Sequence, residues 1–170
     1  MRPPRTALVP VGEIFALRHA VLRPGLPAGA AVFPEDAAPG TFHVAAYDEE
    51  GAVRGCVTFV PEPLPGTGEE AYRFRGMASD PAVRGLGYGV AVLRAGLAEA
   101  AARGAALVWC NGRTAARGFY ERHGFEARGE EFAIEGIGPH AVFTIKLPSS
   151  AGASGAGGAS GASGSVGGPP

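Results

Sequence analysis

The chain reads Arg84-Gly85-Leu86-Gly87-Tyr88-Gly89 between a strand-like run over residues 72–78 and an alanine-rich amphipathic helix. Three glycines at a strand-to-helix corner let successive backbone N–H groups converge without Cβ atoms in the way. The positive end of the helix dipole lies beside them, and the guanidinium of Arg84 can bind two phosphate oxygens at once. The corner therefore predicts a site for a pyrophosphate, with a plain tight turn as the alternative use of the same glycines.

Other glycine-rich phosphate loops fit this corner less well. A P-loop ends in Gly-Lys-Ser/Thr, which this stretch lacks, and a dinucleotide-binding turn is spaced Gly-x-Gly-x-x-Gly. Here Arg84, Gly87 and Gly89 stand at the spacing Arg-x-x-Gly-x-Gly. The stretch resembles the Arg/Gln-x-x-Gly-x-Gly/Ala signature of the GNAT superfamily, the acyl-CoA-dependent N-acyltransferases.

Two further segments strengthen this resemblance. Residues 79–83, Ser-Asp-Pro-Ala-Val, are similar to the short loop that family members place between the fourth strand and the pyrophosphate loop. Residues 106–111 form an apolar run that ends in asparagine, and residues 115–125 read Ala-Ala-Arg-Gly-Phe-Tyr-Glu-Arg-His-Gly-Phe. The latter segment resembles the Ala-x-x-Phe-Tyr-x-x-x-Gly-Phe pattern of GNAT proteins. The resemblance covers residues 72–147, and the N-terminal half is less diagnostic.

The composition is that of a globular domain with a sizeable core. Of the 170 residues, 46% are hydrophobic and 18% charged, and the formal net charge is −1. Scattered basic residues in a near-neutral chain give no electrostatic argument for nucleic acid binding. No apolar run reaches the length of a membrane span, and no signal-peptide core follows the N-terminus, so we expect a cytoplasmic protein without a membrane partner.

The two cysteines do not indicate a metal site. Cys56 and Cys110 lie far apart in strand-like runs, without the paired spacing of zinc ligands. We expect both to behave as small buried hydrophobic side chains, and we expect no metal.

The chain changes character at Ser149. From there to Pro170 it consists almost entirely of glycine, serine and alanine. Such a segment cannot bury enough apolar surface to offset the entropy lost on ordering. We therefore expect a single acetyltransferase domain over residues 1–148 and a disordered tail over residues 149–170.

Hydrophobic periodicity and turn residues predict an alternation of strands and helices. The helix after the glycine loop is expected to bury the stripe Val90, Leu93, Leu97 and Ala101, and a later short helix is expected to begin at an N-cap on Thr114. The expected strands cover residues 6–10, 42–47, 53–60, 72–79, 106–110, 125–134 and 141–147, with helices over residues 11–22, after the glycine loop, and before Gly124. This is the GNAT order, with an N-terminal helix short or irregular between residues 24 and 39.

The resemblance implies both the fold class and the binding of a cofactor. The fold is expected to be α/β (α+β): a central mixed, mostly antiparallel sheet with splayed parallel strands four and five, flanked by helices on both faces. In the family, the pantetheine arm of acyl-CoA fills the gap between the splayed strands, and ordinary pairing along the whole length is the alternative. The residues expected to bind acetyl-CoA are Met77, Ser79, Arg84, Gly85, Gly87, Tyr88, Gly89 and Asn111, the last of these placed at the end of the fifth strand.

Tyr120 and His140 are the expected catalytic residues. The family match places the Tyr120 hydroxyl near the cofactor sulfur, where a phenol could protonate the departing thiolate. Its alternative role is that of a core aromatic packed with Phe119. The carboxylate that some GNAT enzymes carry on the fourth strand has no equivalent in residues 72–77, so His140 is the best-placed base, with a buried hydrogen-bonded histidine as the alternative.

Together these features predict an N-acetyltransferase that moves an acetyl group from acetyl-CoA directly to a primary amine. The acceptor, a small molecule or a peptide, is not legible in the sequence, and a homodimer is left open. A non-catalytic acyl-CoA-binding sensor and a phosphate-binding α/β protein of another family are the competing interpretations.

Overall fold

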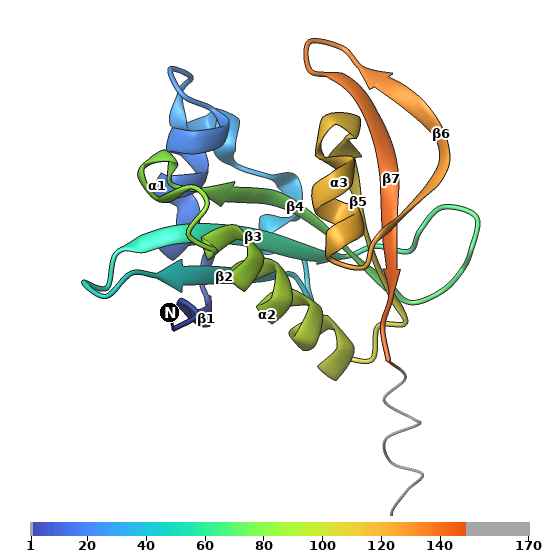
Figure 1. Ribbon diagram of the computed structural model, residues 1–170, viewed down its shortest axis with the longest axis horizontal. Helices are drawn as coiled ribbons and strands as arrows, with labels where there is room; N and C mark the ends of the chain where they lie inside the picture. Colours follow the sequence, from blue (N-terminus) through green and yellow to red (C-terminus); the bar gives the residue numbers. More distant parts are fainter. Residues whose placement is uncertain (1, 149–170) are drawn as a thin grey trace, which may run out of the picture.

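The computed structural model describes residues 2–148, and the expected tail over residues 149–170 lies outside them. Within the described residues, strands and helices alternate along the chain (Figure 1). The strands are β1 (Arg5–Val9), β2 (Phe42–Tyr47), β3 (Val53–Pro61), β4 (Ala71–Ser79), β5 (Leu107–Arg113), β6 (Glu126–Ile134) and β7 (Gly138–Lys146). The α-helices are α1 (Val11–Leu22), α2 (Tyr88–Ala102) and α3 (Arg117–Arg122), and the 3₁₀ helices are η1 (Ala28–Ala31), η2 (Pro34–Ala37), η3 (Pro81–Val83) and η4 (Thr114–Ala116).

The described strands form one seven-stranded sheet in the order β1-β2-β3-β4-β5-β7-β6. Every neighbouring pair is antiparallel except β4 and β5, which run parallel. This confirms the expected mixed, mostly antiparallel sheet. The irregular N-terminal helix is also confirmed, because η1 and η2 occupy the segment between residues 24 and 39.

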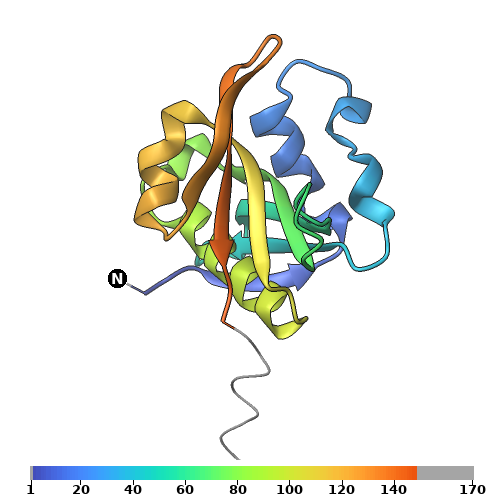
Figure 2. The ribbon, with the colours of Figure 1, turned by 90° about the vertical axis from the view of Figure 1, so that its right-hand side faces the viewer.

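Helices cover both faces of the sheet. On one face, α2 and α3 bury a core in which Val92 and Leu93 pack with Phe59 and Phe74. On the other face, Ile14 of α1 packs with Cys56 and its neighbours in a smaller cluster. Figure 2 shows α1 with the η1–η2 segment on one side of the molecule and α3 on the other. The sheet therefore separates the two hydrophobic clusters, and only a break in the sheet can connect its two faces.

Such a break lies between β4 and β5. The two strands pair only where residues 71–73 of β4 face residues 107–109 of β5. Beyond that point β4 continues for six residues and β5 for four without pairing to each other, and the ribbons diverge (Figures 1 and 2). A bulge in β4 explains the divergence, because Thr58 of β3 pairs with Arg75 and Cys56 pairs with Ala78. Gly76, with φ +65°, takes the left-handed conformation that the bend requires.

Three local expectations were wrong. In α2 the expected stripe is confirmed at Leu93, but the other buried residues are Val92, Gly96 and Ala100, because Gly96 packs directly on the ring of Phe59. Strand β5 does not end at residue 110 but continues to Arg113, held by its pairing with β7. Thr114 does not cap α3: it begins η4, and the N-cap of α3 is Ala116, without a side-chain hydrogen bond.

Candidate active site

The opening between β4 and β5 holds a cavity of about 270 Å³. Residues from the end of α1, from β4, β5 and α3, and from the tip of the β6–β7 hairpin line it. The sequence-predicted residues Met77, Asn111 and Tyr120 are among them. The structure therefore brings three residues from different parts of the chain together at the break in the sheet.

The glycine loop lies at the end of β4, directly before α2. Gly85 and Gly87 have φ values of +81° and +92°, and a Cβ atom on either would meet nothing within 4 Å. Their conformation, rather than crowding, requires glycine at these positions. Gly87 is the N-cap of α2 and provides no side-chain cap, so the first N–H groups of the helix are available to an anion. Arg84 is exposed at the start of this loop.

Ser79 and Gly89 close the corner between strand and helix. A Cβ atom on Gly89 would lie 3.1 Å from Ser79 Oγ, which is a tight approach. Gly89 thus lets the end of β4 contact the first turn of α2. Tyr88 does not line the cavity between β4 and β5. Together with Leu86 it lines a separate cavity of about 700 Å³, whose other walls are the N-terminal segment and the β2–β3 turn.

An arginine fixes the loop to the neighbouring hairpin. Arg54 of β3 donates to the carboxylates of Asp48 and Asp80, both at 2.7 Å. The Asp80 carboxylate also accepts from the Ala82 N–H at 2.9 Å, and this bond together with Arg54 lowers the pKa of Asp80. The segment that precedes Arg84 is therefore held in place before any ligand arrives.

Tyr120 is buried in an aromatic cluster at the edge of the cavity. Its ring stacks on Phe143 with centroids 4.5 Å apart and also contacts Phe119, at 5.5 Å. Gly112 of β5 makes this position accessible, because a Cβ atom there would lie 2.5 Å from Tyr120 Cε2. Tyr120 therefore both packs in the core and lines the cavity.

Burial keeps both Tyr120 and its neighbour Cys110 protonated. It raises the pKa of the Tyr120 phenol, and the nearby Cys110 raises it further. Burial also raises the pKa of the Cys110 thiol, to about 12. A phenol that does not ionise near neutral pH can donate a proton, whereas a thiol that does not ionise is a poor nucleophile.

The structure separates His140 from this group. His140 is buried in β7 opposite Arg113, and its Nδ1 lies 2.8 Å from the Gly138 carbonyl oxygen. It is not among the residues that line the cavity. Asn111 lies inside β5 opposite Val142, with its side chain exposed at the cavity rather than at a strand end.

Sequence reasoning missed four features of the site. Gly76 and Gly112 permit the bulge and the approach of Tyr120, and a glycine inside a strand is the signal that could have indicated them. Arg73 and Arg75 line the cavity, and their alternation around Phe74 could have indicated a polar face of β4.

Comparison with known proteins identifies the family. Residues 38–127 match the family model described as an acetyltransferase (GNAT) domain. The chain is also 33% identical over 143 residues to the uncharacterized N-acetyltransferase YitI of Bacillus subtilis, covering 84% of this chain and 95% of that relative. The protein belongs to the GNAT acetyltransferase family. The expectation of a GNAT acetyltransferase enzyme, made from two motifs, is thereby confirmed.

Solved structures confirm the GNAT fold. The histone acetyltransferase HPA2 and related acetyltransferase from Corynebacterium glutamicum matches with a TM-score of 0.71 at 16% identity, over 87% of this chain and 98% of that one. The GNAT family N-acetyltransferase YhbS from Escherichia coli, solved in complex with CoA, matches with a TM-score of 0.66 at 23% identity, over 87% of this chain and 83% of that one. At these identities the matches establish the fold.

Residues 2–148 form neither a membrane-spanning helix nor a cluster of metal ligands. None of the helices formed by these residues is long and apolar enough to cross a membrane. The same residues bring no three His, Cys, Asp or Glu side chains together in a group that could hold a metal ion.

Proposed function

We propose that this GNAT protein transfers the acetyl group of acetyl-CoA directly to a small primary amine, in the cavity between β4 and β5. The observation that carries the proposal is the break in the sheet. Parallel pairing stops after residues 71–73, and the opening holds a cavity that Met77, Asn111 and Tyr120 line. Pairing along the full length would satisfy more backbone groups, so the bulge that turns β4 away from β5 leaves unpaired groups for a ligand to bond.

The residues around the opening fit an acyl-CoA. The N–H groups at the start of α2 and the guanidinium of Arg84 suit a pyrophosphate, which needs several donors and positive charge. The unpaired edge of β4 near Met77 and Ser79 offers backbone groups to the amides of a pantetheine arm, with the Asn111 side chain facing it from β5. When bound, acetyl-CoA supplies the activated acetyl thioester.

Tyr120 is the group proposed to act as general acid. Tyr120 lines the cavity, and its raised pKa keeps the proton in place until a stronger base appears. A thiolate leaving from the thioester is such a base, and the proton of Tyr120 neutralises it. Cys110 is not proposed as a nucleophile, because a thiol with a pKa of about 12 is almost wholly protonated near neutral pH.

The acceptor amine is proposed to lose its proton to water. Among the described residues that line the cavity there is no Asp, Glu or His side chain. The role of His140 as a base stays a prediction, and its position away from the lining gives it no support. A histidine-to-asparagine change, His140→Asn, decides it, because loss of a base would flatten the rise of kcat/KM with pH.

The decisive experiment measures thiol release from acetyl-CoA with a panel of amines, amino acids, aminoglycosides and peptides. The Tyr120→Phe variant keeps the packing of the ring, so we expect an unchanged KM for acetyl-CoA and a kcat lowered by about 10². Tyr47→Phe is the matched control, because it removes a phenol hydroxyl that bonds Glu13 at 3.1 Å on a different part of the sheet. Equal turnover in Tyr120→Phe and wild type would remove Tyr120 from the chemistry.

The rival interpretation is an acyl-CoA sensor without catalysis. A sensor would bind acetyl-CoA with the same dependence on Arg84 and would release no thiol with any amine. Tight acetyl-CoA binding without turnover across the whole panel would therefore contradict the enzymatic proposal.

A further inference from the structure

Three arginines line the cavity between β4 and β5. Arg73 and Arg75 reach it from the same face of β4, and Arg23 reaches it from the end of α1. The described residues of the lining include no carboxylate side chain. An acceptor site for a simple cationic amine would show the opposite charge, so the arginines require a different explanation.

Arg73 has guanidinium N–H groups that form no strong hydrogen bond with the described residues. Its Nη1 lies 3.5 Å from the Glu62 carboxylate, at the limit of a hydrogen bond, and its guanidinium lies 5.3 Å from the ring centroid of Trp109. Its Nε is buried and has no hydrogen-bond partner among the described residues. The Arg73 side chain is 23% exposed, and its weak contact with Glu62 leaves Nη donors available, so a ligand oxygen bonded to them would be stabilising.

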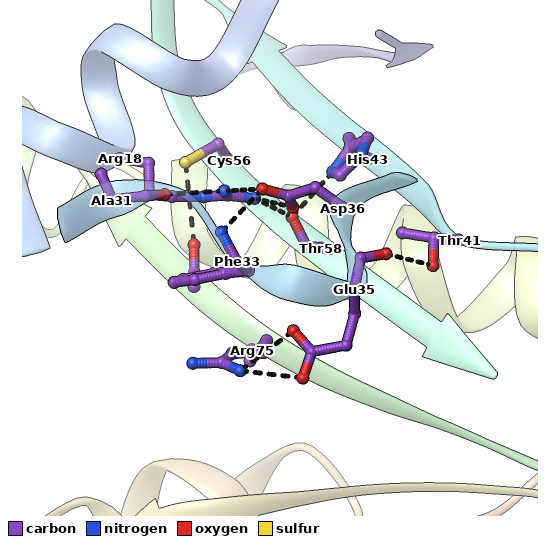
Figure 3. Close-up of polar contacts among 11 residues, drawn as sticks. Arg18, Ala31, Phe33, Glu35, Asp36, Thr41, His43, Cys56, Thr58 and Arg75 are labelled. Carbon is purple, nitrogen blue, oxygen red and sulfur yellow. Dashed lines mark hydrogen bonds and ion pairs between the residues drawn. The ribbon is translucent and has the colours of Figure 1, made fainter. Parts of the chain in front are cut away.

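Contacts with Glu35 and Phe33 fix the position of the Arg75 side chain. Its Nη1 donates to both oxygens of Glu35 at 3.3 Å, and its guanidinium lies 3.9 Å from the ring centroid of Phe33. The guanidinium of Arg18 also packs on the Phe33 ring, 4.0 Å from the same centroid (Figure 3). Burial lowers the pKa of Arg75, Glu35 raises it, and the nearby positive charges of Arg73, Arg18 and Arg23 lower it further.

The balance of charge around the cavity favours a ligand with one negative charge. Arg18 and Asp36 form a bidentate pair at 2.8 and 3.0 Å, so this arginine is neutralised. Glu35 and Glu62 partly neutralise the two arginines of β4. Arg23 donates to the Leu22 carbonyl and is paired with no acidic side chain of residues 2–148. The group therefore retains about a single positive charge, which matches a carboxylate better than a phosphate dianion.

Most of the other residues of the lining are apolar. These are Leu22, Phe33, Phe74, Met77 and Ile134. A volume of about 270 Å³ accommodates a small molecule and not a folded chain. The site thus combines a cationic end with an apolar wall, next to the Tyr120 hydroxyl.

We propose that this cavity selects an acceptor amine that also carries a carboxylate, namely an α-amino acid with an apolar side chain. Arg73 and Arg75 hold its carboxylate, and its apolar side chain lies against the aromatic wall. The inference rests on the proposed acetyl transfer and names the class of acceptor. In the reaction, the free amine attacks the thioester carbon, the C–S bond breaks, and the thiolate takes one proton while the amine loses one, which gives an N-acetylamino acid and CoA.

The test compares acceptors that differ only in the anionic group. Thiol release from acetyl-CoA is measured with L-phenylalanine, with phenethylamine, which lacks the carboxylate, and with the aminophosphonate analogue of phenylalanine. Rates are expressed per unprotonated amine, because the three amines differ in basicity. We expect kcat/KM for L-phenylalanine to exceed that for phenethylamine by about 10- to 100-fold, the effect of a charged hydrogen bond.

Substitution of Arg73 tests whether this arginine causes the preference for a carboxylate. In Arg73→Gln the ratio of kcat/KM for L-phenylalanine to that for phenethylamine should fall by about 10-fold or more. Arg128→Gln is the matched control, because Arg128 is an exposed arginine on β6, outside the lining, and its loss should leave the ratio unchanged. A ratio depends little on the fraction of folded enzyme, so a partly unstable variant still gives a clear result.

A binding measurement does not depend on turnover. The chain has one tryptophan, Trp109, beside the Arg73 guanidinium. L-Phenylalanine added to the CoA-saturated protein should change its fluorescence in a saturable manner, and phenethylamine at the same concentration should not.

The outcomes separate the two proposals. Thiol release that is as fast with phenethylamine as with L-phenylalanine overturns the carboxylate site and leaves acetyl transfer intact, and a preference for the phosphonate overturns the choice of a monoanion. If no amine is acetylated, acetyl transfer fails, and the fluorescence titration alone decides whether the cavity binds a carboxylate.

Discussion

Gly112 and Tyr120 are in such close contact that a methyl group on Gly112 would lie 2.5 Å from the tyrosine ring. The same methyl group would lie 2.8 Å from Phe143 Cδ2, so the ring cannot move aside toward its stacking partner. The backbone of β5 is itself fixed by pairing to β7. The position of the Tyr120 ring at the cavity therefore depends on the absence of a side chain on the neighbouring strand.

Gly112→Ala is expected to displace the Tyr120 ring. A displacement of about 1 Å lowers kcat by about 10- to 100-fold, and overpacking lowers the free energy of unfolding by about 1 to 3 kcal/mol. Steady-state kinetics and denaturant unfolding measure the two effects. Gly118→Ala, on α3 in open space, is the control, and wild-type kcat in Gly112→Ala would show that the ring position does not matter.

The pH dependence of the rate should carry the signature of Tyr120. Burial and Cys110 raise the pKa of the phenol above its usual value of 10, so Tyr120 remains a proton donor throughout the range in which amines deprotonate. We expect kcat/KM to rise with pH until the free amine predominates, without a fall below pH 10. A descending limb between pH 8 and pH 9.5, with the fold intact, would contradict Tyr120 as the acid.

Arg84→Ala should weaken the binding of CoA. Loss of a charged hydrogen bond to a phosphate costs about 1.5 to 3 kcal/mol, which isothermal titration calorimetry resolves readily. Arg128→Ala controls for the loss of one positive charge at an exposed site. The role of the glycine loop would have to be abandoned if both variants bound CoA as tightly as wild type.

Asp36→Asn should destabilise the fold more than Glu35→Gln, although both remove a charge from η2. Asp36 pairs with Arg18, which is completely buried, whereas Glu35 pairs with the half-buried Arg75 (Figure 3). An unpaired buried charge costs about 3 kcal/mol or more, and an exposed pair contributes about 1 kcal/mol at most. Equal unfolding free energies in the two variants would show that Arg18 finds another partner.

The pH dependence of stability gives the same pair a second test. Burial raises the pKa of Asp36, but the hydrogen bonds from Arg18 and the Phe33 N–H outweigh it, so the net pKa lies below the usual 3.8. The pair therefore stabilises fully above about pH 3.8 and loses this contribution as the pH falls through the lowered native value. Wild type should lose its stability advantage over Asp36→Asn in that range, as measured by unfolding at several pH values.

The parts of the fold that depend on local sequence could be predicted. The glycine loop and the succession of strands and helices along the chain follow from turn residues and periodicity, which act over a few positions. The mixed sheet and the irregular N-terminal segment were implied by the family resemblance. The buried stripe of α2 was predicted correctly only at Leu93, because the contact of Gly96 with Phe59 is set by the sheet beneath it. Small residues that allow close packing carry no periodic hydrophobic signal.

The site was predicted only where a motif marks it. Tyr120 and the residues of the glycine loop belong to two motifs; the structure has Tyr120 in the lining of the cavity and the glycine loop between β4 and α2. Arg18 could not be recognised, because an arginine in an amphipathic helix usually faces solvent, and its partner Asp36 comes from a segment without regular periodicity. The cationic character of the cavity likewise depends on α1 and β4 meeting in space.

The short pairing between β4 and β5 is also a weak connection between two parts of the sheet. Three residue pairs join the four strands before the opening to the three strands after it. A molecule that bonds to both strands of the opening would act as a clamp across this seam. The two halves would then open independently when the clamp is absent and together when it is present, so the concentration of the acyl donor would set the cooperativity of unfolding as well as the rate of the reaction.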